Sequence, residues 1–521
     1  MQNVISHARF HWLGYSVIFI GMCIQMYLVS QPLSFLLVHI LPDDAFYYFQ
    51  IARNVAQGIG STFDGIHSTN GYHPLWLLVL TVMYASTDIL NISSEAVVRI
   101  ALIFSVILNT FTAIMLYELL GRYVKNPRIQ ALALSVWVLN PYVLYEMMNG
   151  LETSLATFFL VLFMVLVVAS SKKLSQHRLI CVGCVAGLMI LARVDLVFYF
   201  IAFLLWILLT RGVGQGLGKV LVAGFSASAL VIPWLLWNKI GFGMWLTSAA
   251  EGNAFVNQVL THQSGVGGLY EIKHVIYHLS HFSSLLLDTT GLSILFLIFV
   301  GVLWGMFLHK AIVLHPRLKT IPIEVALLCG FCLLFFADAG IRFTGRSWYF
   351  ISFNIFVALL FVVVVPYIEQ RTTHFKKLFL FLLILCMVGS FSISWHRDLQ
   401  DRMPNQLVIY TATLWSNANL PEGSILGAFN GGIAGYYSIH PVVNLDGLVN
   451  NSALEALEAR TLWNYASQEG ITHFIESEYY FTHRYDTFLG VSNPLGDLTV
   501  IKNFPIPGDT KSGSVSVFQL P

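Results

Sequence analysis

Two adjacent aspartates, Asp43 and Asp44, follow the first long apolar run of the chain. When two carboxylates ionise side by side, their repulsion raises one pKa unless a cation compensates. A carboxylate with a raised pKa suits a general base that takes a proton from a sugar hydroxyl. The same residues could instead begin a helix, where aspartate caps the N-terminus and complements the helix dipole. The pair therefore predicts either a catalytic base, with a divalent cation left open, or a helix start.

A turn-rich stretch over residues 63–76 collects the groups that sugar binding requires, namely polar side chains beside aromatic faces. Its candidates for substrate binding are His67, Asn70, Tyr72 and His73. The alternative is an ordered loop at the membrane interface, where aromatic side chains commonly form a belt. We favour the substrate-binding interpretation.

Two later loops add ionisable residues at the ends of apolar segments. Glu152 lies at the start of one such segment, and Arg193 and Asp195 join two others with almost no loop between them. Ionisable residues in lipid-embedded proteins are costly and tend to mark function. However, Glu152 could belong to a helix-capping turn, and Arg193 with Asp195 could be a structural ion pair. All three are candidate substrate-binding residues.

A pair of arginines, Arg342 and Arg346, precedes Tyr349 in a late loop. Arginine binds phosphate through two parallel hydrogen bonds and stacks on aromatic rings. Arginines beside an apolar segment can also extend simply toward lipid headgroups. These two lie on the acid-rich side of the chain, which favours a phosphate-binding site made of Arg342, Arg346 and Tyr349.

The composition requires lipid around the elements that carry these residues. The 521 residues are 56% hydrophobic and 11% charged, and the mean hydropathy is +0.71. Soluble chains are about 45–50% apolar and about 25% charged. No basic surface interleaved with aromatics indicates nucleic-acid binding. We therefore predict a polytopic α-helical membrane protein that contacts membrane lipids.

A transmembrane helix needs about 20 apolar residues. On that basis we predict about eleven spans, at residues 12–38, 96–120, 129–147, 153–170, 179–193, 195–210, 219–238, 290–309, 322–338, 348–366 and 377–394.

The charges of the connecting loops predict the orientation. With the N-terminus inside, the inner loops contain more than half of the 28 basic residues and few of the 27 acidic ones. Short basic loops mark the cytoplasmic side of a membrane. The acid-rich loops and the C-terminal tail are therefore predicted to lie outside. A span at 74–90 would invert this pattern, so we interpret that segment as an interfacial or partly inserted helix within a first external loop at 39–95.

The tail beyond residue 395 has a different composition from the rest of the chain. Residues 425–429 and 441–445 are typical of short strands, and residues 452–469 have helical periodicity. We therefore predict two regions, a membrane domain at 1–395 and a small extracytoplasmic α/β domain at 396–521.

These motifs, in this order, resemble those of the GT-C superfamily. That group includes protein mannosyltransferases, aminoarabinose transferases, arabinofuranosyltransferases and oligosaccharyltransferases. The resemblance covers the membrane region to about residue 395 and rests on Asp43-Asp44, 71–76, 150–153 and 346–349. The chain lacks the Trp-Trp-Asp signature of oligosaccharyltransferases, which argues against transfer of a whole glycan to asparagine.

The resemblance implies an inverting glycosyltransferase in a bacterial inner or plasma membrane. Its donor would be a polyprenyl-phosphate sugar, and its acceptor a glycan, a lipid or a protein. Asp44 or Asp43 would deprotonate the acceptor hydroxyl, and Arg342 or Arg346 would stabilise the departing phosphate. The sugar or acceptor would be lined by His67, Asn70, Tyr72, His73 and Glu152.

Two other classes compete with the enzyme. A transporter or lipid flippase usually has repeated halves and charges near the bilayer midplane, whereas this chain has no repeated half and carries its charges mostly at span ends. A non-catalytic scaffold would leave the acidic pair and the paired arginines without a shared purpose.

Overall fold

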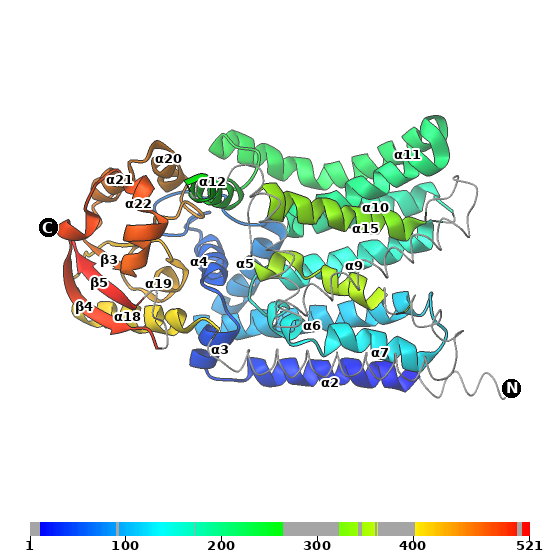
Figure 1. Cartoon of the computed structure of the whole chain (residues 1–521), viewed down its shortest axis with the longest axis horizontal. Coiled ribbons are helices and arrows are strands. Elements are labelled where there is room, and N and C mark those ends of the chain that lie inside the picture. Colours follow the sequence, from blue (N-terminus) through cyan, green and yellow to red (C-terminus); the bar gives the residue numbers. More distant parts are fainter. Residues whose placement is uncertain are drawn as a thin grey trace.

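The computed structural model describes residues 11–89, 93–171, 173–263, 322–341, 346–359, 362, 402–507 and 513–521. Long helices run side by side in a bundle, and a smaller part made of helices and a sheet covers one end of it (Figure 1). The helices of the bundle are α2 (His11–Val29), α6 (Ser94–Leu120), α7 (Pro127–Val138), α8 (Pro141–Glu146), α9 (Thr153–Ser170), α10 (Gln176–Ala192), α11 (Val197–Phe242) and α15 (Ile323–Phe335).

Among the described residues, four helices are long and apolar enough to cross a membrane: His11–Val29, Glu95–Leu120, Thr153–Ser170 and Val194–Phe242. The prediction of a helical membrane protein is confirmed to this extent. The number of eleven spans stays a prediction, because the segments at 290–309 and 377–394 lie outside the described residues.

Helix α11 reverses its direction at Gly212, which has the non-helical angles φ 72° and ψ 160°. A Cβ placed on Gly216 would lie 3.3 Å from the carbonyl oxygen of Ile207. In one continuous helix, nine residues would separate these atoms by roughly 13 Å. The two halves of α11 are therefore antiparallel neighbours, which agrees with separate spans at 195–210 and 219–238.

Two of the expected spans are divided by proline. The segment expected at 12–38 is α2 followed by α3 (Leu33–His39), and Pro32 lies between them. The segment expected at 129–147 is α7 followed by α8, which begins at Pro141. Proline lacks the N–H that would continue a helix and disfavours helical angles in the residue before it. Each of these two predicted spans therefore consists of two helices.

Several shorter elements lie between the bundle and the smaller part (Figure 1). They are α4 (Asp43–Ala56), α5 (Pro74–Ile89) and α12 (Ser248–Gln263). The chain also has three short elements, η1 (Val194–Leu196), η2 (Phe336–Ile341) and η3 (Ser347–Phe350). The segment expected as an interfacial helix at 74–90 is α5, whose position relative to a bilayer stays a prediction. Helix α4 packs against α5 on one side and against α19 (Gly432–Tyr437) on the other.

The smaller part is a mixed α/β unit, as the tail predicts. Its strands are β1 (Leu426–Ala428), β2 (Val442–Asn444), β3 (His473–Glu476), β4 (Thr499–Pro505) and β5 (Ser514–Gln519), in the order β2-β1-β3-β5-β4. The first three strands are parallel, and β5 is antiparallel to both β3 and β4.

The helical elements of the α/β unit are α18 (Pro404–Asn419), α19, α20 (Asn451–Ala459), α21 (Leu462–Gln468), η4 (Tyr480–Arg484), α22 (Asp486–Leu489) and η5 (Pro494–Asp497). The helical segment expected at 452–469 is divided into α20 and α21, because Arg460 adopts a left-handed conformation with φ 57°.

Candidate functional site

The acidic pair, Asp43 and Asp44, lies in the first turn of α4, and the two carboxylates contact different parts of the structure. Pro42 is the N-cap residue, and no side chain caps the helix. Acidic residues in a first turn complement the positive end of the helix dipole. The alternative prediction of a helix start is therefore confirmed, but the two aspartates lie in the first turn and neither is the N-cap residue.

The carboxylate of Asp43 is directed at the α/β unit. It accepts hydrogen bonds of 2.7 Å each from the backbone amides of Gly432 and Ile433 at the start of α19. Burial raises the pKa of Asp43 to about 7, although these two hydrogen bonds oppose the shift. Asp43 therefore holds the α/β unit against α4.

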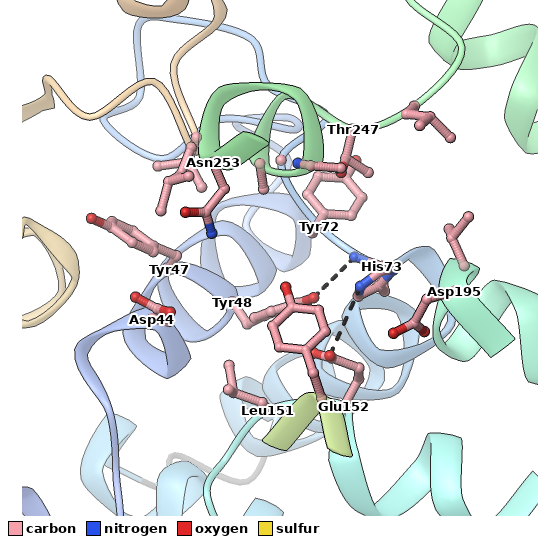
Figure 2. Close-up of a pocket in the computed structure, with 18 of the residues that line it drawn as sticks. Asp44, Tyr47, Tyr48, Tyr72, His73, Leu151, Glu152, Asp195, Thr247 and Asn253 are labelled. Atoms are coloured by element: carbon pink, nitrogen blue, oxygen red, sulfur yellow. Dashed lines mark hydrogen bonds and ion pairs between the residues drawn. The ribbon is translucent and has the colours of Figure 1, made fainter. Parts of the chain in front are cut away.

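Asp44 lines a cavity of about 100 Å³ between the bundle and the α/β unit (Figure 2). Burial raises the pKa of the Asp44 carboxyl; Arg346 opposes that shift and Glu152 adds to it. The other lining residues are Tyr47, Tyr48, Gly71, Tyr72, His73, Leu151, Glu152, Val194, Asp195, Leu246, Thr247, Ala249, Ala250, Asn253, Ala254, Trp348, Tyr349, Leu448 and Val449.

The wall opposite Asp44 contains His73 and Glu152, which face each other (Figure 2). Nε2 of His73 lies 3.8 Å from Oε1 of Glu152. The backbone amide of His73 donates a 3.0 Å hydrogen bond to the hydroxyl of Tyr48, which also contacts Glu152. The indole of Trp76 donates to the carbonyl of Gly150 at 3.0 Å, and this bond ties the loop before Glu152 to α5.

Arg193 and Asp195 form a buried ion pair beside the same cavity. Nη2 of Arg193 lies 2.7 Å from Oδ2 of Asp195, and each side chain is 3% exposed. Arg193 also donates a 2.7 Å hydrogen bond to the carbonyl of Trp348 and covers the ring of Tyr349 at 4.4 Å. Asp195 and Tyr349 line the cavity, whereas Arg193 stands behind them and fixes their positions.

Two candidates of the turn-rich stretch, His67 and Asn70, are not among the lining residues, and neither is Arg346 of the late loop. The imidazole of His67 bridges Asp64, at 2.7 Å, and Glu469 of the α/β unit, at 3.1 Å. The side chain of Asn70 is fully buried and binds Leu246, Ser248 and other residues across three segments. Both side chains order the loop around the cavity.

The arginine pair is described only in part, because Arg342 lies outside the described residues. Arg346 is exposed, and its guanidinium lies 5.7 Å from the ring centre of Trp348. Among charged neighbours, Arg346 has the largest lowering effect on the pKa of Asp44. A cation of the late loop thus acts on the carboxylate that lines the cavity.

The α/β unit also contributes to the site, which the motifs did not predict. The hydroxyl of Tyr47 donates toward Oδ2 of Asp446 at 3.1 Å and accepts from the amide of Gly431 at 3.1 Å. Asp446 follows β2, and burial raises its pKa to about 7. Ligand-binding residues often follow the carboxyl ends of parallel strands. Asp446 and Gly447 directly follow the strand predicted at 441–445, so their position could have indicated a functional residue in the tail.

The acidic pair does not fit a cation held by both carboxylates. Both oxygens of Asp43 are engaged by amide donors of α19, so only Asp44 is directed at the cavity. Among the described residues, no group of three or more histidine, cysteine or acidic side chains could hold a metal ion.

The fold is similar to that of two membrane glycosyltransferases of known structure. One is the Archaeoglobus fulgidus oligosaccharyltransferase in its apo form, with a TM-score of 0.57 and 13% identity over 97% of this chain and 74% of that chain. AglB from the same organism, in complex with an inhibitory peptide and a dolichol-phosphate, has a TM-score of 0.55 and 13% identity over 91% of this chain and 70% of that chain.

The second protein is ArnT from Cupriavidus metallidurans bound to undecaprenyl phosphate. Its TM-score is 0.53, with 10% identity over 96% of this chain and 97% of that chain. The resemblance to the GT-C superfamily is therefore confirmed at the level of the fold. A family model described as a domain of unknown function (DUF8728) matches residues 398–518. No curated protein matches the sequence.

Proposed function

We propose that this chain is an inverting glycosyltransferase that moves a sugar from a polyprenyl-phosphate carrier to a glycan, lipid or protein acceptor. The GT-C fold supports a lipid-linked donor, since similar structures contain a dolichol-phosphate and an undecaprenyl phosphate. The observation that carries the proposal is the position of Asp44, which lines the cavity while Arg346 acts on it electrostatically.

Asp44 is the general base of the proposed reaction. Its raised pKa makes it a stronger proton acceptor than an ordinary aspartate. Asp44 takes the proton of the acceptor hydroxyl while the oxygen attacks the anomeric carbon from the face opposite the phosphate. The bond from that carbon to the phosphate oxygen breaks, the configuration inverts, and the phosphate leaves with the electron pair. Arg346, together with Arg342, stabilises the negative charge that develops on the phosphate.

The remaining lining residues bind the sugar and the acceptor. Tyr72, His73, Glu152 and Asp195 present polar atoms to the cavity beside the ring of Tyr349. This combination suits a sugar, which offers hydroxyls around its rim and apolar C–H faces. Arg193 holds Asp195 in position through their ion pair.

We propose that the site lies on the extracytoplasmic face, with the N-terminus cytoplasmic, in an inner or plasma membrane. Helix α2 begins at the end of the bundle far from the α/β unit (Figure 1). The basic loops belong to that same far end: Arg211 donates to the carbonyl of Ser171, and Tyr123 contacts Glu324 there. Because short basic loops remain inside, the α/β unit and the cavity face outward.

Release of polyprenyl phosphate tests the proposal. The full-length protein in nanodiscs is given polyprenyl-phosphate sugars, and Asp44→Asn should reduce the release rate about 10²–10⁴-fold. Asp486→Asn removes another aspartate from a first helical turn, at the exposed start of α22, and should leave the rate unchanged. Equal rates for the Asp44→Asn variant and the parent would refute the assignment of the base. Lipid or glycan uptake into vesicles without release would favour a transporter.

A further inference from the structure

A second arginine, Arg484, lies at the side of the α/β unit that meets α4. Arg484 ends η4, and its guanidinium lies 5.6 Å from the ring centre of Tyr485. The ring of Tyr485 stacks on that of Phe429 at 4.4 Å, with an angle of 8° between the planes. The backbone amide of Phe429 is held by Glu476 at 3.0 Å. The segment that carries Arg484 is therefore firmly supported.

This aromatic stack connects Arg484 to the cavity. The carbonyl oxygen of Phe429 lies 3.3 Å from the hydroxyl of Tyr47 and shares its hydrogen with Asp446. Tyr47 lies three residues after Asp44 on α4, so the two side chains share one helix face, and both line the cavity. The positive charge of Arg484 acts on Asp44 and also on Asp446. Arg484 therefore lies behind the part of the cavity wall that Tyr47 forms, and its charge reaches Asp44.

Arg346 lies on the bundle side of the cavity, next to the lining residue Trp348. Its charge also acts on Asp44, and both Arg346 and Arg484 act on Tyr480 of η4. Within the described ranges, neither guanidinium lies within 4 Å of a carboxylate, whereas Arg193 and Arg402 each form an ion pair. Two like charges near one cavity repel each other, and a bound anion would relieve that repulsion.

We propose that Arg346 and Arg484 bind one phosphate group from two sides beside Asp44, so that the α/β unit supplies half of the phosphate site. This inference rests on the proposed function and assigns Arg484 to its donor. Guanidinium groups match phosphate oxygens with two parallel hydrogen bonds each. A site divided between the two parts forms only when the α/β unit is docked on α4.

Direct binding tests the site without knowledge of the sugar. The full-length protein in nanodiscs is titrated with polyprenyl phosphate, and the uncharged polyprenol serves as the control lipid. Arg484→Gln should weaken binding of the phosphate lipid about 10- to 100-fold, the usual effect of losing a hydrogen bond to a charged group. Arg484→Lys should weaken binding by an intermediate factor, since lysine keeps the positive charge but cannot form the two parallel hydrogen bonds of a guanidinium. Lys502→Gln removes an exposed charge from β4 and should have no effect.

The outcomes separate the inference from the proposed function. If Arg346→Gln weakens binding and Arg484→Gln does not, the two-sided site is refuted and the donor assignment stands. If the parent binds polyprenol as tightly as polyprenyl phosphate, both are refuted. If inorganic phosphate displaces the lipid at similar concentrations and Arg484→Gln abolishes this competition, the two-sided phosphate site is supported. The same result would contradict the proposed lipid-linked donor, because the site would then bind free phosphate.

Discussion

Oδ2 of Asp43 accepts a 2.7 Å hydrogen bond from the backbone amide of Gly432, which is 389 residues away in the sequence. The carboxylate thus joins the first turn of α4 to the first turn of α19. Its neighbour Asp44 lines the cavity instead. Two adjacent residues of identical type therefore have different surroundings, one at a contact between parts of the fold and one at the candidate site.

Asparagine at position 43 should lower stability, whereas asparagine at position 44 should lower activity. Asp43→Asn should lower the free energy of unfolding by about 1.5–3 kcal/mol, because charged hydrogen bonds to two buried amides are lost. Asp44→Asn should leave unfolding almost unchanged and remove activity. Thermal unfolding in detergent and protease release of the α/β unit measure the first effect. Equal stability of the Asp43→Asn variant and the parent would contradict the role given to Asp43.

The close approach of α4 and α19 leaves no room for a side chain at Gly432. A Cβ on Gly432 would lie 2.1 Å from the backbone oxygen of Asp43, a distance that only a backbone shift can relieve. Gly432→Ala should therefore destabilise the protein by about 1–3 kcal/mol, the usual cost of overpacking. A Cβ on Gly431 meets nothing closer than 3.4 Å, so Gly431→Ala is the matched control. Similar unfolding temperatures for the two variants would show that α4 and α19 can separate at little cost.

The apolar runs were sufficient to predict the bundle and two strands of the tail, β1 and β2, whereas β3, β4 and β5 were not predicted. The reversal at Gly212 agrees with the loop predicted between 210 and 219. Local hydropathy could not predict the breaks before α3 and α8, because Pro32 and Pro141 interrupt helices without interrupting the apolar run.

The sequence could identify candidate residues within single motifs, but it could not show which of them meet at the cavity. His73 belongs to the same turn-rich stretch as His67, yet only His73 lines the cavity. The difference depends on Glu469, which binds His67 from the α/β unit. Arg484 was missed for the same reason, since the position of η4 beside α4 depends on contacts made across most of the chain.

The ion pair between Arg193 and Asp195 offers a test of a structural role against a catalytic one. Both side chains are buried, so removal of one partner leaves an uncompensated charge. Arg193→Met and Asp195→Leu should each lower stability by about 3–5 kcal/mol, and the variant with both substitutions should lose less than the sum of the two. Denaturant unfolding in mixed micelles measures these differences. Additive losses would indicate that the two side chains are energetically independent.

His67 should make the contact between the first loop and the α/β unit depend on pH. The hydrogen bond to Asp64 and the charges of Asp64 and Glu469 raise the pKa of His67, while burial acts in the opposite direction. Because the folded pKa is above the unfolded value of about 6.5, the contact contributes fully below pH 6.5 and is lost as the pH rises through the folded value. The pKa of Asp64 is lowered, since hydrogen bonds from His67 and Ile66 outweigh its burial, so that carboxylate contributes above about pH 4.

The contact should therefore be strongest between about pH 4 and 6.5. We expect His67→Gln to lower the unfolding temperature at pH 6 and to have a smaller effect at pH 8, because the parent loses the charged form of His67 over that interval. His483→Gln, which changes an exposed histidine of η4, should have the same effect at both pH values. Because His67 is partly exposed, added salt should reduce the difference at pH 6. A difference between parent and His67→Gln that is constant from pH 6 to pH 8 would mean that the imidazole does not change its charge over that interval, which contradicts this prediction.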